Sequence, residues 1–186
     1  MRLAKLLIVL YGLVLPCLAA GEEMIAANPD RIKAAFLRNF ARYVVWPEAA
    51  FPDAGSSWHI CILGPDPFGN LLDETLEGRI EQGRPFEIFR NTRLDASPSC
   101  QILYVAFDQP AQRRAVLAAL QHRPVLTVGD ADDFLLEGGM IRLQVGERVE
   151  MSINLDQAKA ASLRIQTKML EVSRQVLENG ILRTRR

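Results

Sequence analysis

The sequence contains few of the residues on which enzymes depend for nucleophilic or metal chemistry. It has only two histidines, His59 and His122, among 186 residues. His59 lies inside an apolar run and His122 in a turn before Pro124, and neither has a partner at metal-ligand spacing, so no zinc or similar metal site is predicted. A Gly-x-Ser-x-Gly nucleophile turn is also absent from the sequence. We therefore expect a protein without catalytic residues, metal or cofactor.

An excess of charge of either sign is also missing. The chain has 22 basic and 22 acidic residues, and removal of Arg2 and Lys5 with the leader described next leaves 20 basic against 22 acidic residues, a formal net charge of −2. A partner dominated by phosphate groups requires a basic face on the protein. The composition therefore predicts that the protein does not bind nucleic acid.

Long apolar runs are absent except at the beginning. Two basic residues precede the apolar run 6–14, and small residues follow it. This pattern is typical of a secretory signal peptide, and the run is shorter than the ~20 residues of a membrane helix. An uncleaved anchor is one alternative; lipidation at Cys17 is another, but Pro16 stands where a small residue is expected. We expect a signal peptide over residues 1–20, a periplasmic protein and no direct membrane insertion after cleavage.

Cysteine is scarce once the leader is removed. Cys61 and Cys100 are the two that remain. In an oxidising compartment such a pair predicts one disulfide, which stabilises a chain of this loop length by roughly 3–4 kcal/mol in the chain-entropy model. The alternative is two buried free thiols, because Cys61 lies in a strand-like apolar run.

The first element after the leader is predicted to be an amphipathic helix. Asn28 has the character of an N-cap and Pro29 that of the first helical residue. Trp46-Pro47 ends the helix, since the residue before proline is driven out of helical geometry. An apolar stripe at i, i+4 spacing is formed by Ile32, Phe36, Phe40 and Val44.

The rest of the chain alternates between apolar strands and helical stretches. The strands are predicted at 58–63, 85–89, 102–107 and 125–128, with helices through 76 and over 112–120. This order predicts a single three-layer α/β domain over residues 28–178, with a mostly parallel sheet flanked by helices. A C-terminal β-hairpin is predicted over 141–153 with a two-residue turn at Gly146-Glu147. From Asp156 a closing helix is predicted, with an apolar stripe reaching Val176, and residues 179–186 are expected to form a flexible basic tail.

Two surfaces are candidates for function. Aromatic and arginine side chains are common anchors of protein interfaces, which makes the following residues candidates for contacts with a partner or in a homodimer: Phe36, Arg38, Phe40, Arg42, Trp46 and Arg164. The alternative for the two phenylalanines is burial in the core. A ligand crevice at the carboxyl ends of the strands is the second candidate, near Asp66, Asp108 and Asp130. Solvated loop or helix-capping roles are the alternative for these aspartates.

Several segments resemble the YfiR-like family, in one order along nearly the whole chain after the leader. The matching segments are KAAFL (33–37), NFA (39–41), VWP (45–47), CILG (61–64), DPFG (66–69), PVLTVGD (124–130), GGMI (138–141), INL (153–155) and LRI (163–165).

The resemblance implies a periplasmic α/β domain, often dimeric, that represses a membrane-anchored diguanylate cyclase of the YfiN type by binding its periplasmic sensory region. Cyclic di-GMP and biofilm formation rise when repression is lifted. The pair Cys61 and Cys100 matches a cysteine pair that forms a disulfide in the family. A second pair found in some members is absent, with Phe134 and Ile141 in the corresponding stretch, and Ser162 stands where glycine is expected. The alternative function is a small-ligand-binding sensor module that acts on another membrane receptor.

Overall fold

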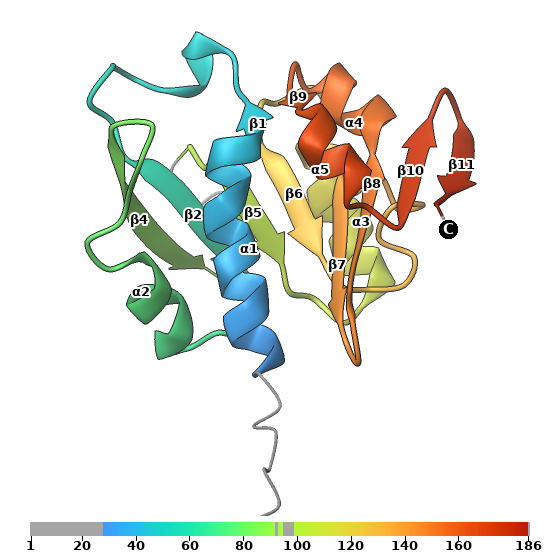
Figure 1. The fold of residues 1–186 in the computed structure, drawn as a ribbon, viewed down its shortest axis with the longest axis horizontal. Coiled ribbons are helices and arrows are strands. Elements are labelled where there is room, and N and C mark those ends of the chain that lie inside the picture. Colours follow the sequence, from blue (N-terminus) through green and yellow to red (C-terminus); the bar gives the residue numbers. More distant parts are fainter. Residues whose placement is uncertain (1–27, 92, 95–98, 186) are drawn as a thin grey trace, which may run out of the picture.

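The computed structural model describes residues 28–91, 93–94 and 99–185, and the expected signal peptide at 1–20 lies outside them. The described part is a layered α/β structure built on a nine-stranded sheet. Figure 1 shows α1 on one side of this sheet and α3 on the other. Among the described residues, no helix is long and apolar enough to cross a membrane.

The first helix begins as the sequence predicts. Helix α1 (Pro29–Tyr43) starts after Asn28, whose Oδ1 accepts the backbone N–H of Asp30 at 2.9 Å. The apolar stripe is rotated from the predicted one, because the buried face of the helix consists of Lys33, Ala34, Leu37, Phe40 and Ala41. Phe36, at the centre of the predicted stripe, is only partly buried at the margin of this face.

The main sheet confirms the predicted mostly parallel arrangement. Its strand order is β11-β10-β8-β7-β6-β5-β2-β4-β3. The strands are β2 (Trp58–Leu63), β3 (Ile80–Glu81), β4 (Arg84–Asn91), β5 (Ile102–Val105), β6 (Leu126–Gly129), β7 (Ile141–Val145), β8 (Val149–Asn154), β10 (Gln175–Glu178) and β11 (Ile181–Thr184). Pairing is parallel from β4 through β2, β5 and β6 to β7, and between β8 and β10. It is antiparallel for β3–β4, β7–β8 and β10–β11.

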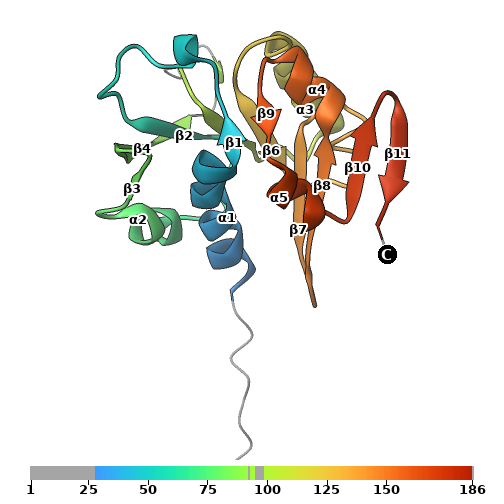
Figure 2. The same ribbon diagram turned by 45° about the horizontal axis from the view of Figure 1, so that its top comes forward.

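The two faces of the sheet have separate apolar cores. The side chains of β2 alternate between them: Ile60 and Ile62 join the core beneath α1, whereas Cys61 and Leu63 pack with Leu117 on the other face. The remaining elements are α2 (Asn70–Leu76), α3 (Pro110–Ala119), α4 (Leu155–Ala160), α5 (Thr167–Glu171), the 3-10 turn η1 (Glu48–Ala50), β1 (Val44–Val45) and β9 (Arg164–Ile165). In the turned view of Figure 2, α1 and α2 lie side by side, and β10 and β11 form one edge of the sheet.

The predicted closing helix is wrong beyond its first turns. Helix α4 ends because Ser162 has a φ of +60°, a left-handed conformation that does not continue a helix. The N–H of Leu163 donates to the carbonyl of Ala158 at 2.8 Å, and that of Ser162 to the carbonyl of Lys159 at 3.0 Å. These two bonds form a Schellman motif, in which residue C′ is most often glycine.

The C-terminal third of the chain differs from the prediction in further ways. Val176 belongs to strand β10 rather than to a helix, and residues 181–184 form strand β11 rather than a loose tail. The hairpin of β7 and β8 is confirmed, but Val145 pairs with Val149, so the loop has three residues instead of the two that were predicted.

Candidate functional site

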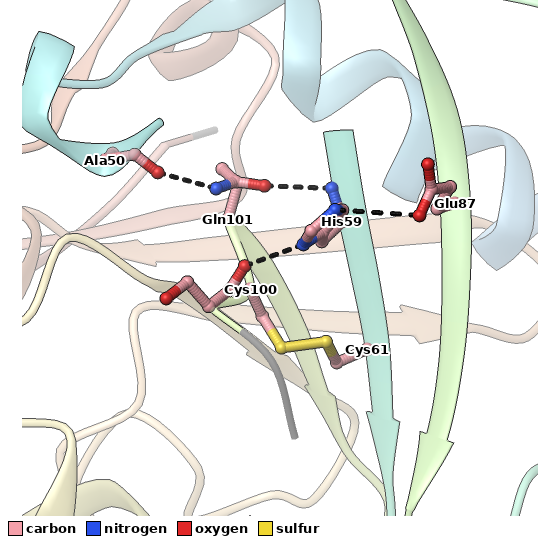
Figure 3. Close-up of a disulfide and its surroundings, with 7 residues drawn as sticks. Ala50, His59, Cys61, Glu87, Cys100 and Gln101 are labelled. Atoms are coloured by element: carbon pink, nitrogen blue, oxygen red, sulfur yellow. Dashed lines mark hydrogen bonds and ion pairs between the residues drawn. A yellow bond between two sulfur atoms is a disulfide. The ribbon is translucent and has the colours of Figure 1, made fainter. Parts of the chain in front are cut away.

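The predicted disulfide is present. Cys61 of β2 is bonded to Cys100, which lies two residues before the start of β5, and both side chains are buried. Figure 3 shows that Gln101, next to the bond, is held from two sides. Its Nε2 donates to the carbonyl of Ala50 at 2.7 Å, and its Oε1 accepts the N–H of His59 at 2.8 Å. The disulfide therefore belongs to a rigid join between two central strands and the η1 turn.

Each histidine ring contacts a backbone carbonyl. The Nδ1 of His59 is 3.0 Å from the carbonyl of Ser99, and its Nε2 is 3.8 Å from a carboxylate oxygen of Glu87. His122 Nδ1 is 3.4 Å from the carbonyl of Ala160. Within the ranges that the structure describes, no three His, Cys, Asp or Glu side chains are grouped so that they could hold a metal ion.

The three predicted crevice aspartates follow adjacent parallel strands. Asp66, Asp108 and Asp130 come after β2, β5 and β6, so they lie along the same edge of the sheet. Two of them are engaged by cations of the protein itself. Asp66 accepts from Arg90 Nε at 2.7 Å and from the N–H of Phe68 at 2.8 Å.

Asp130 has a similar intramolecular partner. Its Oδ2 accepts from the buried ammonium group of Lys33 at 2.7 Å, which ties α1 to the end of β6. Asp108 is exposed, and its carbonyl accepts from Arg113 Nη1 at 2.6 Å. The aspartates therefore fix the surrounding helices and loops, and only Asp108 presents a carboxylate without an ion-pair partner among the described residues.

A buried tyrosine lies beneath this edge. The hydroxyl of Tyr104 makes no hydrogen bond of good geometry with any described group, and the residue is 1% exposed. Burial raises its pKa, and the nearby carboxylates of Asp130 and Asp30 raise it further. A buried polar group without a partner is uncommon in native structures and is a position where a bound molecule gains a hydrogen bond.

The predicted contact residues divide into a core group and a surface group. Trp46 was predicted to be an exposed anchor, and this is wrong: it is buried against Trp58, with ring centroids 5.0 Å apart. Trp46 directly follows β1 and belongs to the same apolar core as Trp58. Phe40 is also a core residue, as the alternative held.

The predicted arginines lie on the surface, in different places. Arg42 makes a bidentate contact with Glu81, at 3.1 Å from Nε and 2.8 Å from Nη2 to Oε2. Arg164 is exposed in β9, opposite Val45 of β1. Arg38 is half-buried, without an ion pair among the described residues. Arg38 and Arg42 lie one turn apart on α1, and Arg164 lies in β9, so the predicted arginines come from two elements.

A small apolar groove lies between α1 and α5. It is about 150 Å³ in volume, enough for one aromatic ring, and Met151 of β8 is part of its lining. The helical residues that line it are Phe36, Asn39, Phe40 and Tyr43 from α1, with Lys168, Met169 and Val172 from α5 and its C-terminal end. The groove is almost entirely apolar, with the Lys168 ammonium 6.0 Å from the Tyr43 ring centre.

Two hydrogen bonds and one strand pairing hold the two walls of this groove together. The carbonyl of Tyr43 accepts the N–H of Gln166 at 3.0 Å, and Gln166 Nε2 donates to the carbonyl of Arg42 at 3.2 Å. Together with the β1–β9 pairing, these bonds fasten the start of α5 to the end of α1.

Val172 is 70% exposed at the groove, which is unusual for an aliphatic side chain beside other apolar residues.

The sequence missed the α5 side of the groove. Met169 and Val172 were placed on the buried stripe of one long helix, where both would face the core. Because α5 is a separate short helix that ends at Glu171, Met169 is buried whereas Val172, directly after its end, is exposed. The only sequence signal for such a surface was Phe36, which the predicted stripe did contain.

A comparison with known protein families identifies the group to which this fold and surface belong. The model of the family described as YfiR/HmsC-like matches residues 30–174. The match begins in α1 and ends directly before β10, so it includes both helices of the groove and both cysteines of the disulfide. The chain belongs to the YfiR/HmsC-like family.

Proposed function

We propose that this protein is a periplasmic regulatory protein that binds the periplasmic sensory region of a membrane-anchored diguanylate cyclase and represses it. Membership of the YfiR/HmsC-like family supports a role in the regulation of a diguanylate cyclase system. The basic, apolar and small-residue pattern of residues 1–20 supports export to the periplasm. Repression lowers cyclic di-GMP and biofilm formation, and the protein acts by binding, without catalysis.

The observation that carries this proposal is the apolar groove between α1 and α5. A binding protein needs a surface on which a few side chains are buried by its partner, and such anchors are most often large apolar or aromatic residues. The groove offers Phe36 and Tyr43 on one wall and Val172 on the other, beside a single cation, Lys168. A large apolar side chain of the cyclase sensory region fits this arrangement.

Repression requires no change of shape in the regulator itself. A receptor with an active and an inactive conformation is held inactive when the regulator binds the inactive one more tightly. To move such an equilibrium from 1:99 to 99:1, the difference in affinity must be about 10⁴-fold. Loss of one groove contact therefore shifts cyclase output without unfolding the regulator.

The test is intracellular cyclic di-GMP in a deletion strain complemented with matched variants. Val172→Asp places a charge in the groove, and Leu136→Asp is the control, because Leu136 is 79% exposed and does not line the groove. We expect the deletion to raise cyclic di-GMP, wild type and Leu136→Asp to lower it again, and Val172→Asp to fail. Full complementation by Val172→Asp would remove the groove from the proposal, and an unchanged deletion strain would remove the cyclase.

We also propose a homodimer, with Arg164 as a contact residue. Arg164 and Val45 are cross-strand partners of the small β1–β9 sheet, and both side chains are exposed. An arginine beside an exposed aliphatic residue has the composition of an interface anchor. Arg164→Glu should shift the sedimentation coefficient toward that of a monomer. If both the oligomeric state and receptor binding stay unchanged, Arg164 has no such role.

A second candidate function is a small-ligand sensor that acts on another membrane receptor. The buried hydroxyl of Tyr104 beneath the aspartate edge favours it, because this group lies near Asp130 and makes no hydrogen bond of good geometry with any described residue. A ligand with a hydrogen-bond acceptor or donor would satisfy this group, and Tyr104→Phe should abolish its effect on thermal stability. A screen of metabolites that raises the melting temperature of wild type and of Tyr104→Phe equally would exclude this site.

A further inference from the structure

The backbone conformation of the outermost hairpin, formed by β10 and β11, defines its turn type and its hydrogen-bond register. Strands β10 and β11 are joined by Asn179 and Gly180, with φ values of +54° and +71°. Positive φ at both positions is the mark of a type I′ turn. In a two-residue hairpin the residues that flank the turn, here Glu178 and Ile181, exchange both of their backbone hydrogen bonds.

This register determines which backbone groups of β11 point away from the sheet. Inward bonding alternates along an antiparallel strand, so Ile181, Arg183 and Arg185 bond toward β10. The bond from Arg185 N–H to the carbonyl of Arg174 at 2.9 Å confirms the alternation. The N–H and C=O groups of Leu182 and Thr184 therefore point outward, where no described strand pairs with them.

Among the described residues, the outer edge of β11 has one of the usual protections of an edge strand, the charged side chain of Arg183. Natural sheets block their edges with charged side chains, proline, a bulge, a very short strand or a covering helix. The opposite edge, β3, is only two residues long. Strand β11 has four residues, no proline and no bulge in its pairing, and all four side chains are exposed. Ile181 and Leu182 are 55% and 49% exposed, so the edge is apolar as well as unpaired.

Arginine side chains are concentrated around this edge. Arg174, Arg183 and Arg185 are exposed and have no ion pair with any described carboxylate. Two nearby acids are engaged: Glu178 binds Lys159 at 2.7 Å, and Asp156 accepts two backbone N–H groups of the turn. Arg174 and Arg185 line a hollow together with Glu150 and Glu171, and Arg185 Nη1 donates to the carbonyl of Leu170 at 2.9 Å, so the outward charge of β11 itself comes from Arg183. Arg183 and Ile181 share one face of the strand, and Leu182 and Thr184 share the other.

A second copy of this chain fits this edge poorly. Antiparallel self-pairing would bring the Arg183 face of one copy beside the Arg183 face of the other, and like charges near each other across a strand pair are destabilising. An extended segment with acidic side chains on one face and apolar side chains on the other matches both faces of β11.

We propose that β11 is a docking edge at which an extended, acidic segment of a partner protein adds a tenth strand to the nine-stranded sheet. The segment's backbone pairs with the outward groups of Leu182 and Thr184, as in other cases of β-strand addition. Its carboxylates lie opposite Arg183, and its apolar residues lie opposite Leu182. This edge is separate from the α1–α5 groove and does not depend on the cyclase being the partner.

The test uses the ¹⁵N-labelled exported protein and a capped six-residue peptide that alternates glutamate and valine. We expect saturable amide shifts at 181–185 and in β10, with a dissociation constant that rises steeply with salt. The same peptide with lysine in place of glutamate, and a peptide with N-methylated alternate amides, should bind at least tenfold more weakly.

Two variants separate backbone pairing from side-chain contact. Leu182→Pro removes the outward N–H without breaking a bond to β10, and Leu182→Ala is its control, because it loses the same side chain and keeps the donor. Only Leu182→Pro should abolish peptide binding, with the amide shifts of 175–178 showing that β10 remains in place. Arg183→Glu should reverse the preference between the glutamate and lysine peptides.

Three outcomes would overturn the proposal. One is the absence of shifts at β11 at millimolar peptide, and another is equal binding by Leu182→Pro and Leu182→Ala. The third is a concentration-dependent dimer that Leu182→Pro abolishes and the peptide does not dissociate, which would assign the edge to a second copy of the chain.

Discussion

The carboxylate of Asp156 accepts the backbone N–H of Gly180 at 2.8 Å, which joins the first turn of α4 to the outer hairpin turn. Its other oxygen accepts the N–H of Asn179, also at 2.8 Å. These two bonds hold the pKa of Asp156 below its usual value of 3.8, since they favour the charged form. One side chain therefore stabilises the turn on which the β10–β11 hairpin depends.

The hairpin should loosen in acid. A carboxylate with a lowered folded-state pKa contributes stability that is present above the unfolded pKa, here near 3.8, and is lost as pH falls through the lower folded value. Hydrogen exchange of the Asn179 and Gly180 amides should therefore accelerate below about pH 3.8 relative to the central strands. Asp156→Asn should show fast exchange already at neutral pH and no such dependence. Equal protection in wild type and variant would show that the cap does not hold the turn.

Replacing Ser162 with glycine should stabilise the protein. Ser162 occupies the left-handed C′ position of the Schellman motif after α4, with φ at +60°. A residue with a Cβ loses roughly 1–2 kcal/mol in that conformation, which glycine adopts without strain. Ser162→Gly should raise the free energy of unfolding by about 1 kcal/mol in urea titrations. Ser162→Ala, which keeps the Cβ, should give no gain, and a gain of equal size in both variants would contradict the explanation.

Position 162 is one place where the sequence already indicated a special backbone conformation. The family resemblance places glycine at position 162, and the structure supplies the physical reason in the left-handed C′ residue. Ala158, Ile165 and Met169 fall close to helical spacing, which predicts one helix from Asp156. Local spacing cannot reveal that a left-handed residue, β9 and the β10 pairing divide this stretch, since those depend on distant parts of the chain.

The sequence contains a hairpin signal at Asn179-Gly180, although the helical spacing predicted a helix up to Val176. Asn179-Gly180 is a strong hairpin dipeptide when β-type residues flank it on both sides. Val176 and Leu177 before it and Ile181 and Leu182 after it provide such flanks. The parallel core strands were predictable because their apolar runs are continuous and buried on both faces.

The candidate groove was only half predictable. Phe36 was identified from the helix stripe, but its partners Met169 and Val172 come from α5, more than a hundred residues later. Trp46 was misplaced because the exposure of an aromatic residue after a helix depends on where the next strand goes. Surface contacts between distant elements are a tertiary property, and helical periodicity does not encode them.

Breaking the buried ion pair between Arg113 and Glu137 should destabilise the fold strongly. Both side chains are about 95% buried, and the contact is bidentate at 2.7 and 2.8 Å, which anchors α3 to the loop before β7. Removing one partner of a buried pair costs about 3–5 kcal/mol when the other charge is left uncompensated. Arg113 keeps the carbonyls of Phe107 and Asp108 as acceptors, so the lower end of this range is expected. Glu137→Gln should lower the free energy of unfolding by this order.

The control for Glu137→Gln is Glu74→Gln, which breaks an exposed ion pair instead of a buried one. Glu74 pairs with Arg31 at 3.0 Å, but both side chains are more than half exposed. Exposed pairs contribute only about 0–1 kcal/mol, so little change is expected. Equal effects of the two substitutions, measured by chemical unfolding, would show that burial does not determine the strength of the Arg113 contact.

Reduction of the disulfide should lower stability without disturbing the groove. The bond closes a loop with a sequence separation of 39 residues, for which the chain-entropy model gives about 4 kcal/mol. The cysteines belong to the core on the α3 face, and the groove lies on the α1 face. The double variant Cys61→Ala/Cys100→Ala should lose this stability and still repress the cyclase at permissive temperature. Loss of repression in a protein that remains folded would instead give the bond a regulatory role.

Phe134 requires glycine on both sides of its ring. The ring is fully buried, and a Cβ added at Gly129 or at Gly139 would fall inside the van der Waals radius of its atoms. Gly139→Ala should therefore destabilise by about 1–3 kcal/mol, the usual cost of overpacking.

A smaller residue at position 134 should relieve the clash with a Cβ at position 139. Phe134→Leu alone creates a cavity, but it removes the ring atoms that a Cβ at position 139 would meet. The double variant Phe134→Leu/Gly139→Ala should consequently be more stable than the sum of the two single effects predicts, by at least 0.5 kcal/mol in a double-mutant cycle. Strict additivity would mean that the alanine clashes with the backbone carbonyl of Phe134 rather than with its ring, since that oxygen is also within contact range of the added Cβ.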